Sequence, residues 1–116
     1  MPPREHIMNP GDLLVQYLKA YQAKDLPTIE TLLADQVRLQ DWNLTALGKA
    51  AVLAETEKNF NDAKHLRIDI LRVYAIGRHA AAELRILVNE TIELNAVDVI
   101  SLDEQGKVDA IRAYKG

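Results

Sequence analysis

Apolar residues recur at the spacing of an α-helix in three segments of the first half of the chain. Asn9 and Asp25 can each cap a helix start, and a proline follows each of them within the first turn, where it is tolerated. A third helix is predicted from Gly48 to about Phe60, and Val37 to Asp41 alternates as a short strand before it. The apolar residues expected to face inward from the helices are Leu13, Leu14, Tyr17, Leu18, Tyr21, Ile29, Leu32, Leu33, Ala51, Val52 and Leu53.

The second half of the chain changes to a period of two, which is typical of β-strands with one buried face. Turns are predicted at Gly77, at Asn89-Glu90 and before Gly106. Three helices followed by long antiparallel strands predict an α+β fold, with the helices packed on one face of a curved sheet. The four long strands are expected from Leu66 to Gly77, from Ala80 to Val88, from Thr91 to Leu102 and from Val108 to Tyr114.

Length and charge narrow the class of protein. The chain has 116 residues, which predicts one domain over residues 9–116 after a flexible tail over residues 1–8. Lys and Arg number 14 against 17 Asp and Glu, so the net charge of −3 argues against nucleic acid or an anionic membrane as a partner. No segment is long and apolar enough to span a bilayer. The absence of cysteine fits a reducing environment, and we expect a cytoplasmic protein.

Asp98 interrupts the pattern of its strand. The face that carries it is otherwise apolar, with Leu94, Ala96, Ile100 and Leu102 in the same row. A buried, unpaired carboxylate is costly, so such a group takes up a proton or recruits a partner. The alternative is that a β-bulge turns Asp98 to solvent, or that its carboxyl satisfies a buried backbone group. The pattern alone leaves these interpretations open.

Asp41 and Tyr17 also place a polar group on an otherwise apolar face. Asp41 ends the short strand on the same face as Val37 and Leu39, where it either faces the interior or simply starts a turn. Tyr17 lies on the apolar stripe of the first helix, and its hydroxyl either enters a site or is part of the core. Two inward carboxyl groups and a tyrosine in one small domain form a set that can carry out proton transfer.

Other chemistry finds little support. The three histidines are scattered without the spacing of metal ligands, and no glycine-rich loop is present to hold a phosphate. We therefore expect neither a metal nor an organic cofactor. Trp42, next to Asp41, either covers the mouth of a cavity or is an exposed aromatic. Glu83 and Arg85 belong to the outer face of the sheet, as a solvated surface or as part of an interface.

The order of these features resembles the nuclear transport factor 2-like (SnoaL-like) superfamily, and within it the ketosteroid isomerases. The resemblance rests on the segment from Tyr17 to Asp41, on the helix start Gly48-Lys-Ala-Ala-Val and on the hairpin from Asp98 to Val108. It covers about residues 13–114. It implies a cone-shaped, curved, antiparallel or mixed sheet wrapped around three N-terminal helices, and it implies a homodimer, for which the outer-face residues Glu83, Arg85 and Leu87 are the candidate contact.

The resemblance also implies roles for the three residues that interrupt the pattern. Tyr17 matches the tyrosine that hydrogen-bonds the substrate carbonyl oxygen, Asp41 matches the general base, and Asp98 matches a protonated aspartic acid that is the second donor to that oxygen. The implied reaction moves a C=C bond of an enolisable ketone through a dienolate. The residues expected to contact this small, apolar, carbonyl-containing ligand are Trp42, Phe60, Leu84 and Ile86.

The chain departs from the steroid-binding members of the family. It has one phenylalanine, Phe60, and it places Ala80 and Ala82 on the inward face of a strand where those members have bulkier groups. A steroid is therefore not the expected substrate. Two alternatives stay open beside the isomerase: a SnoaL-like polyketide cyclase, and a non-catalytic module that binds a small ligand or dimerises.

Overall fold

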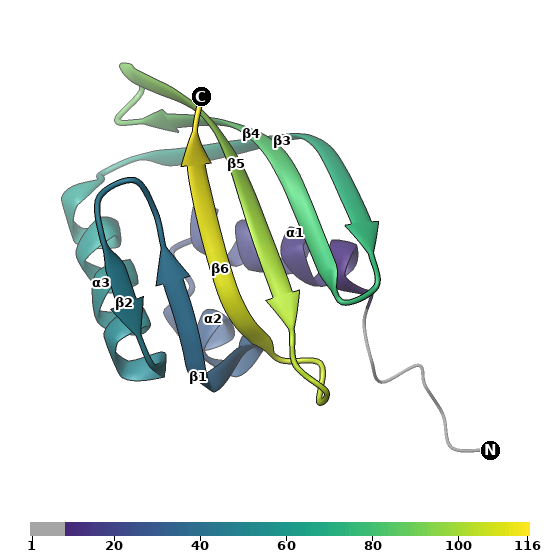
Figure 1. Cartoon of the computed structure of the whole chain (residues 1–116). Coiled ribbons are helices and arrows are strands. Elements are labelled where there is room, and N and C mark those ends of the chain that lie inside the picture. Colours follow the sequence, from purple (N-terminus) through teal and green to yellow (C-terminus); the bar gives the residue numbers. More distant parts are fainter. Residues whose placement is uncertain (1–8) are drawn as a thin grey trace.

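The computed structural model describes residues 9–116 and contains three helices and six strands within that range (Figure 1). The flexible tail expected at residues 1–8 lies outside the described residues. In chain order the elements are α1 (Pro10–Gln22), α2 (Leu26–Leu32), β1 (Leu33–Gln40), β2 (Thr45–Leu47), α3 (Lys49–Asp62), β3 (Leu66–Ile76), β4 (His79–Val88), β5 (Ile92–Leu102) and β6 (Val108–Lys115).

The two predicted helix caps are confirmed. The side chain of Asn9 accepts a hydrogen bond of 2.8 Å from the backbone N–H of Asp12 at the start of α1. Asp25 accepts one of 3.2 Å from the N–H of Thr28 at the start of α2. Each bond satisfies a backbone donor that has no partner inside the helix. The Asn9 cap marks the start of α1, and the Asp25 cap marks the start of α2.

The sheet has the strand order β2-β1-β6-β5-β4-β3 and does not close into a barrel. β1 runs parallel to β6, and the other neighbours are antiparallel, so the sheet is mixed. Figure 1 shows the three helices on one side of the curved sheet. α1 packs against β3, β4 and β5, and α3 packs against β1 and β2. The predicted α+β architecture is confirmed.

Two details of the first half differ from the prediction. β1 begins at Leu33, directly after α2, and not at Val37, because Leu33 already has extended backbone angles although the next residues lack alternation. The segment predicted as a loop before α3 contains the short strand β2, which pairs with the end of β1. Asp41 consequently follows the last residue of β1 and belongs to the turn between β1 and β2.

The core lies between the helices and the inner face of the sheet. Its most deeply buried side chains include Leu14 of α1, Ile29 of α2, Val52 of α3 and Ile100 of β5. Among residues 9–116 no helix is long and apolar enough to cross a membrane. The core does not fill the whole space beneath α1 and α3, and the remaining space is the site described next.

Candidate active site

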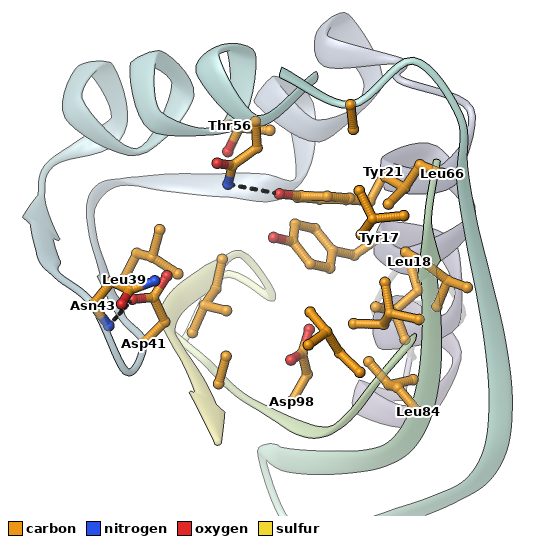
Figure 2. Close-up of a pocket in the computed structure, with 18 of the residues that line it drawn as sticks. Tyr17, Leu18, Tyr21, Leu39, Asp41, Asn43, Thr56, Leu66, Leu84 and Asp98 are labelled. Carbon is orange, nitrogen blue, oxygen red and sulfur yellow. Dashed lines mark hydrogen bonds between the residues drawn. The ribbon is translucent and has the colours of Figure 1, made fainter. Parts of the chain in front are cut away.

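A cavity of about 320 Å³ opens between α1, α3 and the inner face of the sheet (Figure 2). This volume falls in the range of small-molecule sites. Most of the wall is apolar, with a few polar groups spread around it. The lining residues are Tyr17, Leu18, Tyr21, Leu39, Asp41, Trp42, Asn43, Thr56, Asn59, Asp62, Ala63, Leu66, Ile68, Leu84, Ile86, Val88, Leu94, Asp98, Ile111 and Ala113.

Tyr17 points from α1 into this cavity (Figure 2). Its side chain is 4% exposed, and its hydroxyl has no hydrogen-bond partner within residues 9–116. Burial, and then the neighbouring Tyr21 and Asp98, raise the pKa of Tyr17 well above its usual value. The hydroxyl therefore keeps its proton and is a donor without an acceptor, which is the form suited to bind a ligand oxygen.

Asp98 reaches the same cavity from the middle of β5. Its pairing is regular on both sides, opposite Ala82 of β4 and Ala113 of β6, so no bulge turns it to solvent. The two alanines leave space around the carboxyl and offer it no side-chain partner. The side chain is only half-buried because it borders the cavity. Burial, and secondarily the charge of Asp41, raise the pKa of Asp98 to about 7.

Asp41 has two roles, and both interpretations from the sequence are correct. Its Oδ1 accepts hydrogen bonds from the backbone N–H groups of Asn43, at 2.7 Å, and Leu44, at 2.9 Å, which hold the turn after β1. The residue also lines the cavity, across from Asp98 and Tyr17 (Figure 2). Its other oxygen, Oδ2, accepts no hydrogen bond from the described residues. Two N–H donors on one oxygen stabilise a carboxylate, while Oδ2 stays available.

The residues expected to contact the ligand divide into two groups. Trp42, Leu84 and Ile86 line the cavity, and Trp42 is 43% exposed at its rim. Phe60 does not line it. Phe60 packs edge-on against Tyr21, with ring centroids 4.9 Å apart, and so supports the wall from behind. The sequence predicted a ligand contact for Phe60 but could not show that its ring packs against Tyr21.

Tyr21 and Asn59 are polar groups of the cavity that were not identified from the sequence. Asn59 Nδ2 donates a hydrogen bond of 3.0 Å to the Tyr21 hydroxyl, which the dashed line in Figure 2 marks. Tyr21 lies one helical turn after Tyr17 on the same face of α1, and the ring centroids are 5.9 Å apart. The four-residue spacing of the two tyrosines was the available signal. In the sequence analysis Tyr21 counts only as one of the residues of the apolar stripe that face the core.

The charges around the cavity are of one sign. Asp41, Asp62 and Asp98 line it, and none of its lining residues is a lysine, arginine or histidine. Among residues 9–116, no group of three potential ligands stands close enough to hold a metal ion. The arrangement combines two carboxyl groups and two tyrosine hydroxyls around an apolar space. Such a set can move a proton and stabilise an oxygen anion without a metal.

An open mixed sheet, three helices on one face and a mostly apolar cavity between them define a class of small α+β proteins. The chain belongs to the SnoaL-like domain family, whose sequence model matches residues 14–111. This result confirms the superfamily to which the sequence was related. No match to a curated protein was found.

Solved structures share the fold at low sequence identity. A candidate ketosteroid isomerase from Kribbella flavida is 17% identical over 92% of this chain and 77% of its own, with a TM-score of 0.82. An LEH-like epoxide hydrolase of M. tuberculosis is 16% identical over 92% and 82%, with a TM-score of 0.79. A candidate polyketide cyclase from Sinorhizobium meliloti is 14% identical over 88% and 93%, also with a TM-score of 0.79. The same fold therefore occurs in a candidate isomerase, a candidate cyclase and an epoxide hydrolase.

Proposed function

We propose that this protein is an isomerase that moves a C=C bond of a small, apolar, enolisable ketone through a dienolate. One observation carries the proposal: two carboxyl groups of one cavity have opposite surroundings. Asp98 accepts no hydrogen bond from residues 9–116, and its pKa is raised to about 7, which favours the acid. Asp41 accepts two backbone N–H hydrogen bonds, the kind of contact that a carboxylate makes. Proton abstraction next to a carbonyl needs one of each.

The reaction follows from these two states. Asp41 Oδ2 removes a proton from the carbon next to the carbonyl, and the C–H electron pair forms a dienolate. Tyr17 and protonated Asp98 donate hydrogen bonds to the oxygen as it gains negative charge. Asp41 then returns the same proton to the γ-carbon, so the double bond moves and no atom is gained or lost. Donors held in a cavity that largely excludes water stabilise such an anion better than water does.

Binding of a dienolate mimic tests the oxygen-binding pair. We expect 2-naphthol, a planar phenol that fits an apolar site, to bind the wild type, as followed by its fluorescence. The Tyr17→Phe variant should bind it about 10- to 100-fold more weakly, because it loses the hydrogen bond from the Tyr17 hydroxyl to the oxygen of the probe. Tyr114→Phe, the same change at an exposed tyrosine outside this cavity, should bind like the wild type. Equal affinity of Tyr17→Phe and wild type would refute the oxygen-binding role.

Exchange of α-protons tests the base. 2-Tetralone in D₂O should exchange its α-protons faster with the wild type than without protein, as measured by ¹H NMR. Asp41→Asn should lower the protein-catalysed rate by about 10²- to 10⁴-fold, the usual contribution of a general base. Asp35→Asn is the matched control, because Asp35 lies on β1 with a side chain 94% exposed. An undiminished rate in Asp41→Asn would rule out this base.

A second candidate function, a non-catalytic ligand-binding module, is favoured by the role of Asp41 in the turn. Its hydrogen bonds to Asn43 and Leu44 would be useful even if the residue never touched a substrate. The two candidates differ in one outcome. A binding module would hold 2-naphthol in a manner that depends on Tyr17 and would leave the exchange of 2-tetralone at its uncatalysed rate.

A further inference from the structure

The hydroxyl of Tyr21 is held in a defined orientation at the cavity. Asn59 Nδ2 donates to it at 3.0 Å, and Phe60 packs against the ring at an interplanar angle of 76°. Because Asn59 uses a lone pair of the hydroxyl oxygen, the proton of Tyr21 remains to be donated elsewhere. Within residues 9–116 no side chain or backbone carbonyl accepts it. Figure 2 shows the hydroxyls of Tyr21 and Tyr17 on the same side of their rings, toward the cavity.

The carbonyl oxygen bound by Tyr17 already has two donors in the proposed reaction. In Figure 2, Tyr17 lies between Tyr21 on one side and Asp98 on the other. A carbonyl oxygen has two lone pairs, and in the proposed reaction these accept from Tyr17 and Asp98. The proton of Tyr21 therefore needs a different acceptor, close to the first because the two tyrosine rings are 5.9 Å apart.

We propose that Tyr21 and Asn59 form a second oxygen-binding subsite, which selects a ketone that carries a second, uncharged oxygen beside the reacting carbonyl. The subsite lies toward the mouth of the cavity, because Asn59 is exposed and Tyr21 is half-buried. This inference rests on the proposed function, since it takes the first oxygen to be the one bound by Tyr17 and Asp98. It narrows the substrate class from ketones in general to hydroxyketones, alkoxyketones and diketones.

The charge of the surroundings explains why the second oxygen is uncharged. Asp41 and Glu55 act on Tyr21 as neighbouring negative charges, and Asp98 adds to them when it is ionised. Asp62 lines the same cavity, and no basic side chain of residues 9–116 lines it. A carboxylate or phosphate on the ligand would be repelled by these groups without a cation to offset the repulsion. A hydroxyl, ether or carbonyl oxygen accepts the Tyr21 proton without that cost.

The test compares one-oxygen and two-oxygen probes. Wild-type affinity is measured by fluorescence titration for 2-naphthol and for two dihydroxynaphthalenes. The 2,3-isomer carries its hydroxyls on adjacent ring carbons, and the 1,3-isomer carries them with one ring carbon between. We expect at least one dihydroxy compound to bind about tenfold more tightly than 2-naphthol, the upper range for one neutral hydrogen bond. Tyr21→Phe should abolish this preference and leave 2-naphthol within about twofold of the wild type.

Two variants separate the subsite from the rest of the cavity. Asn59→Asp keeps the shape of the side chain but turns its donor into an acceptor, so Tyr21 donates to the new carboxylate and the preference should disappear with the ring in place. Tyr17→Phe should weaken all three probes by the same factor and preserve the preference. The ratio of affinities is the readout, so a general change in charge or stability does not imitate the effect.

The outcomes distinguish this inference from the proposed function. If the preference is absent in the wild type or persists in Tyr21→Phe, the subsite is wrong while the role of Tyr17 can still stand. If Tyr21→Phe weakens 2-naphthol as much as the dihydroxy probes, Tyr21 acts through Tyr17 on one oxygen, and the second-oxygen assignment is overturned. If 2-naphthol binding does not depend on Tyr17, the proposed function fails, and a wild type that binds none of the probes overturns both.

Discussion

Asp98 is the residue whose ionisation should be visible in the stability of the protein. Its pKa is about 7 in the folded state, against about 3.9 for an unfolded chain. Between these values the native state holds a proton that the unfolded state releases. The free energy of unfolding should therefore fall as the pH rises from about 4 to 7, by up to about 1.4 kcal/mol per pH unit. Asp98→Asn should lose this slope in urea titrations from pH 4 to 8. Identical pH dependence of variant and wild type would contradict the raised pKa.

The same group should set the alkaline limit of activity. Because only protonated Asp98 donates to the dienolate oxygen, the rate of 2-tetralone exchange should decline above about pH 7. Asp98→Asn keeps an N–H donor that does not titrate, so its rate should be lower but no longer decline there. A wild-type rate that stays constant up to pH 9 would remove Asp98 from the site.

At the scale of residues, the sequence predicted those site residues whose polarity interrupts an apolar pattern. Asp98 was identified because it is the one carboxyl in an apolar row of β5, and the structure excludes the bulge that would have turned it outward. Tyr21 was not identified because a tyrosine on a helix stripe looks the same in the sequence whether its hydroxyl meets solvent, core or cavity. Its role depends on Asn59, which reaches it from α3.

At the scale of elements, Lys24 joins two segments that are far apart in the chain. It lies in the turn between α1 and α2 with a left-handed φ of 56°. Its ammonium donates to the carbonyl of Ala63, directly after α3, and at 3.4 Å to that of Lys64. The last turn of α3 has no basic residue of its own. Lys24 therefore neutralises the negative end of α3 and holds the segment that leads into β3, part of the cavity wall.

Two substitutions separate the bond from the backbone strain at this position. Lys24→Met loses the hydrogen bonds and keeps the strain, so we expect a loss of about 1–2 kcal/mol in the free energy of unfolding and weaker 2-naphthol binding. Lys24→Gly also loses the bonds but adopts this φ without a steric penalty, so it should be about 1 kcal/mol more stable than Lys24→Met. Urea unfolding measures both differences. A Met variant as stable as the wild type would show that the contact with α3 contributes nothing.

Helices and strands could be predicted from the sequence where their pattern of apolar and polar residues was long enough to show a period. The helix caps and the four long strands follow from capping residues, turns and alternation over eight or more positions. β2 has three residues, too few for a period to show. Its pairing with β1 depends on the turn held by Asp41, a contact between backbone and side chain that composition does not indicate.

At the scale of the whole molecule, the outer face of the sheet is the face that no helix covers in residues 9–116. In residues 9–116 the helices all lie against the other face (Figure 1). Two large exposed side chains of this outer face are Tyr74 and Ile76 at the end of β3, 49% and 80% exposed. Glu83 and Arg85, expected to contact a second copy, are already engaged within the chain: Glu83 accepts from the Tyr74 hydroxyl, and Arg85 pairs with Asp69 at 3.1 Å. The apolar outer-face positions are therefore the better candidates for contact.

We propose that two copies associate through this outer face, and Val99 offers the test. Val99 pairs with Ala81 of β4 and Arg112 of β6 on that face. In Val99→Glu the new carboxylate lies beside Arg112, so the single chain should tolerate it, while an apolar contact of about 800 Å² per partner would not. Sedimentation at micromolar concentration should give a dimer for the wild type and a monomer for Val99→Glu. Ile92→Glu, at an exposed position off this face, should remain dimeric. A monomeric wild type would mean that the outer face of the sheet is left open to solvent and that each cavity functions alone.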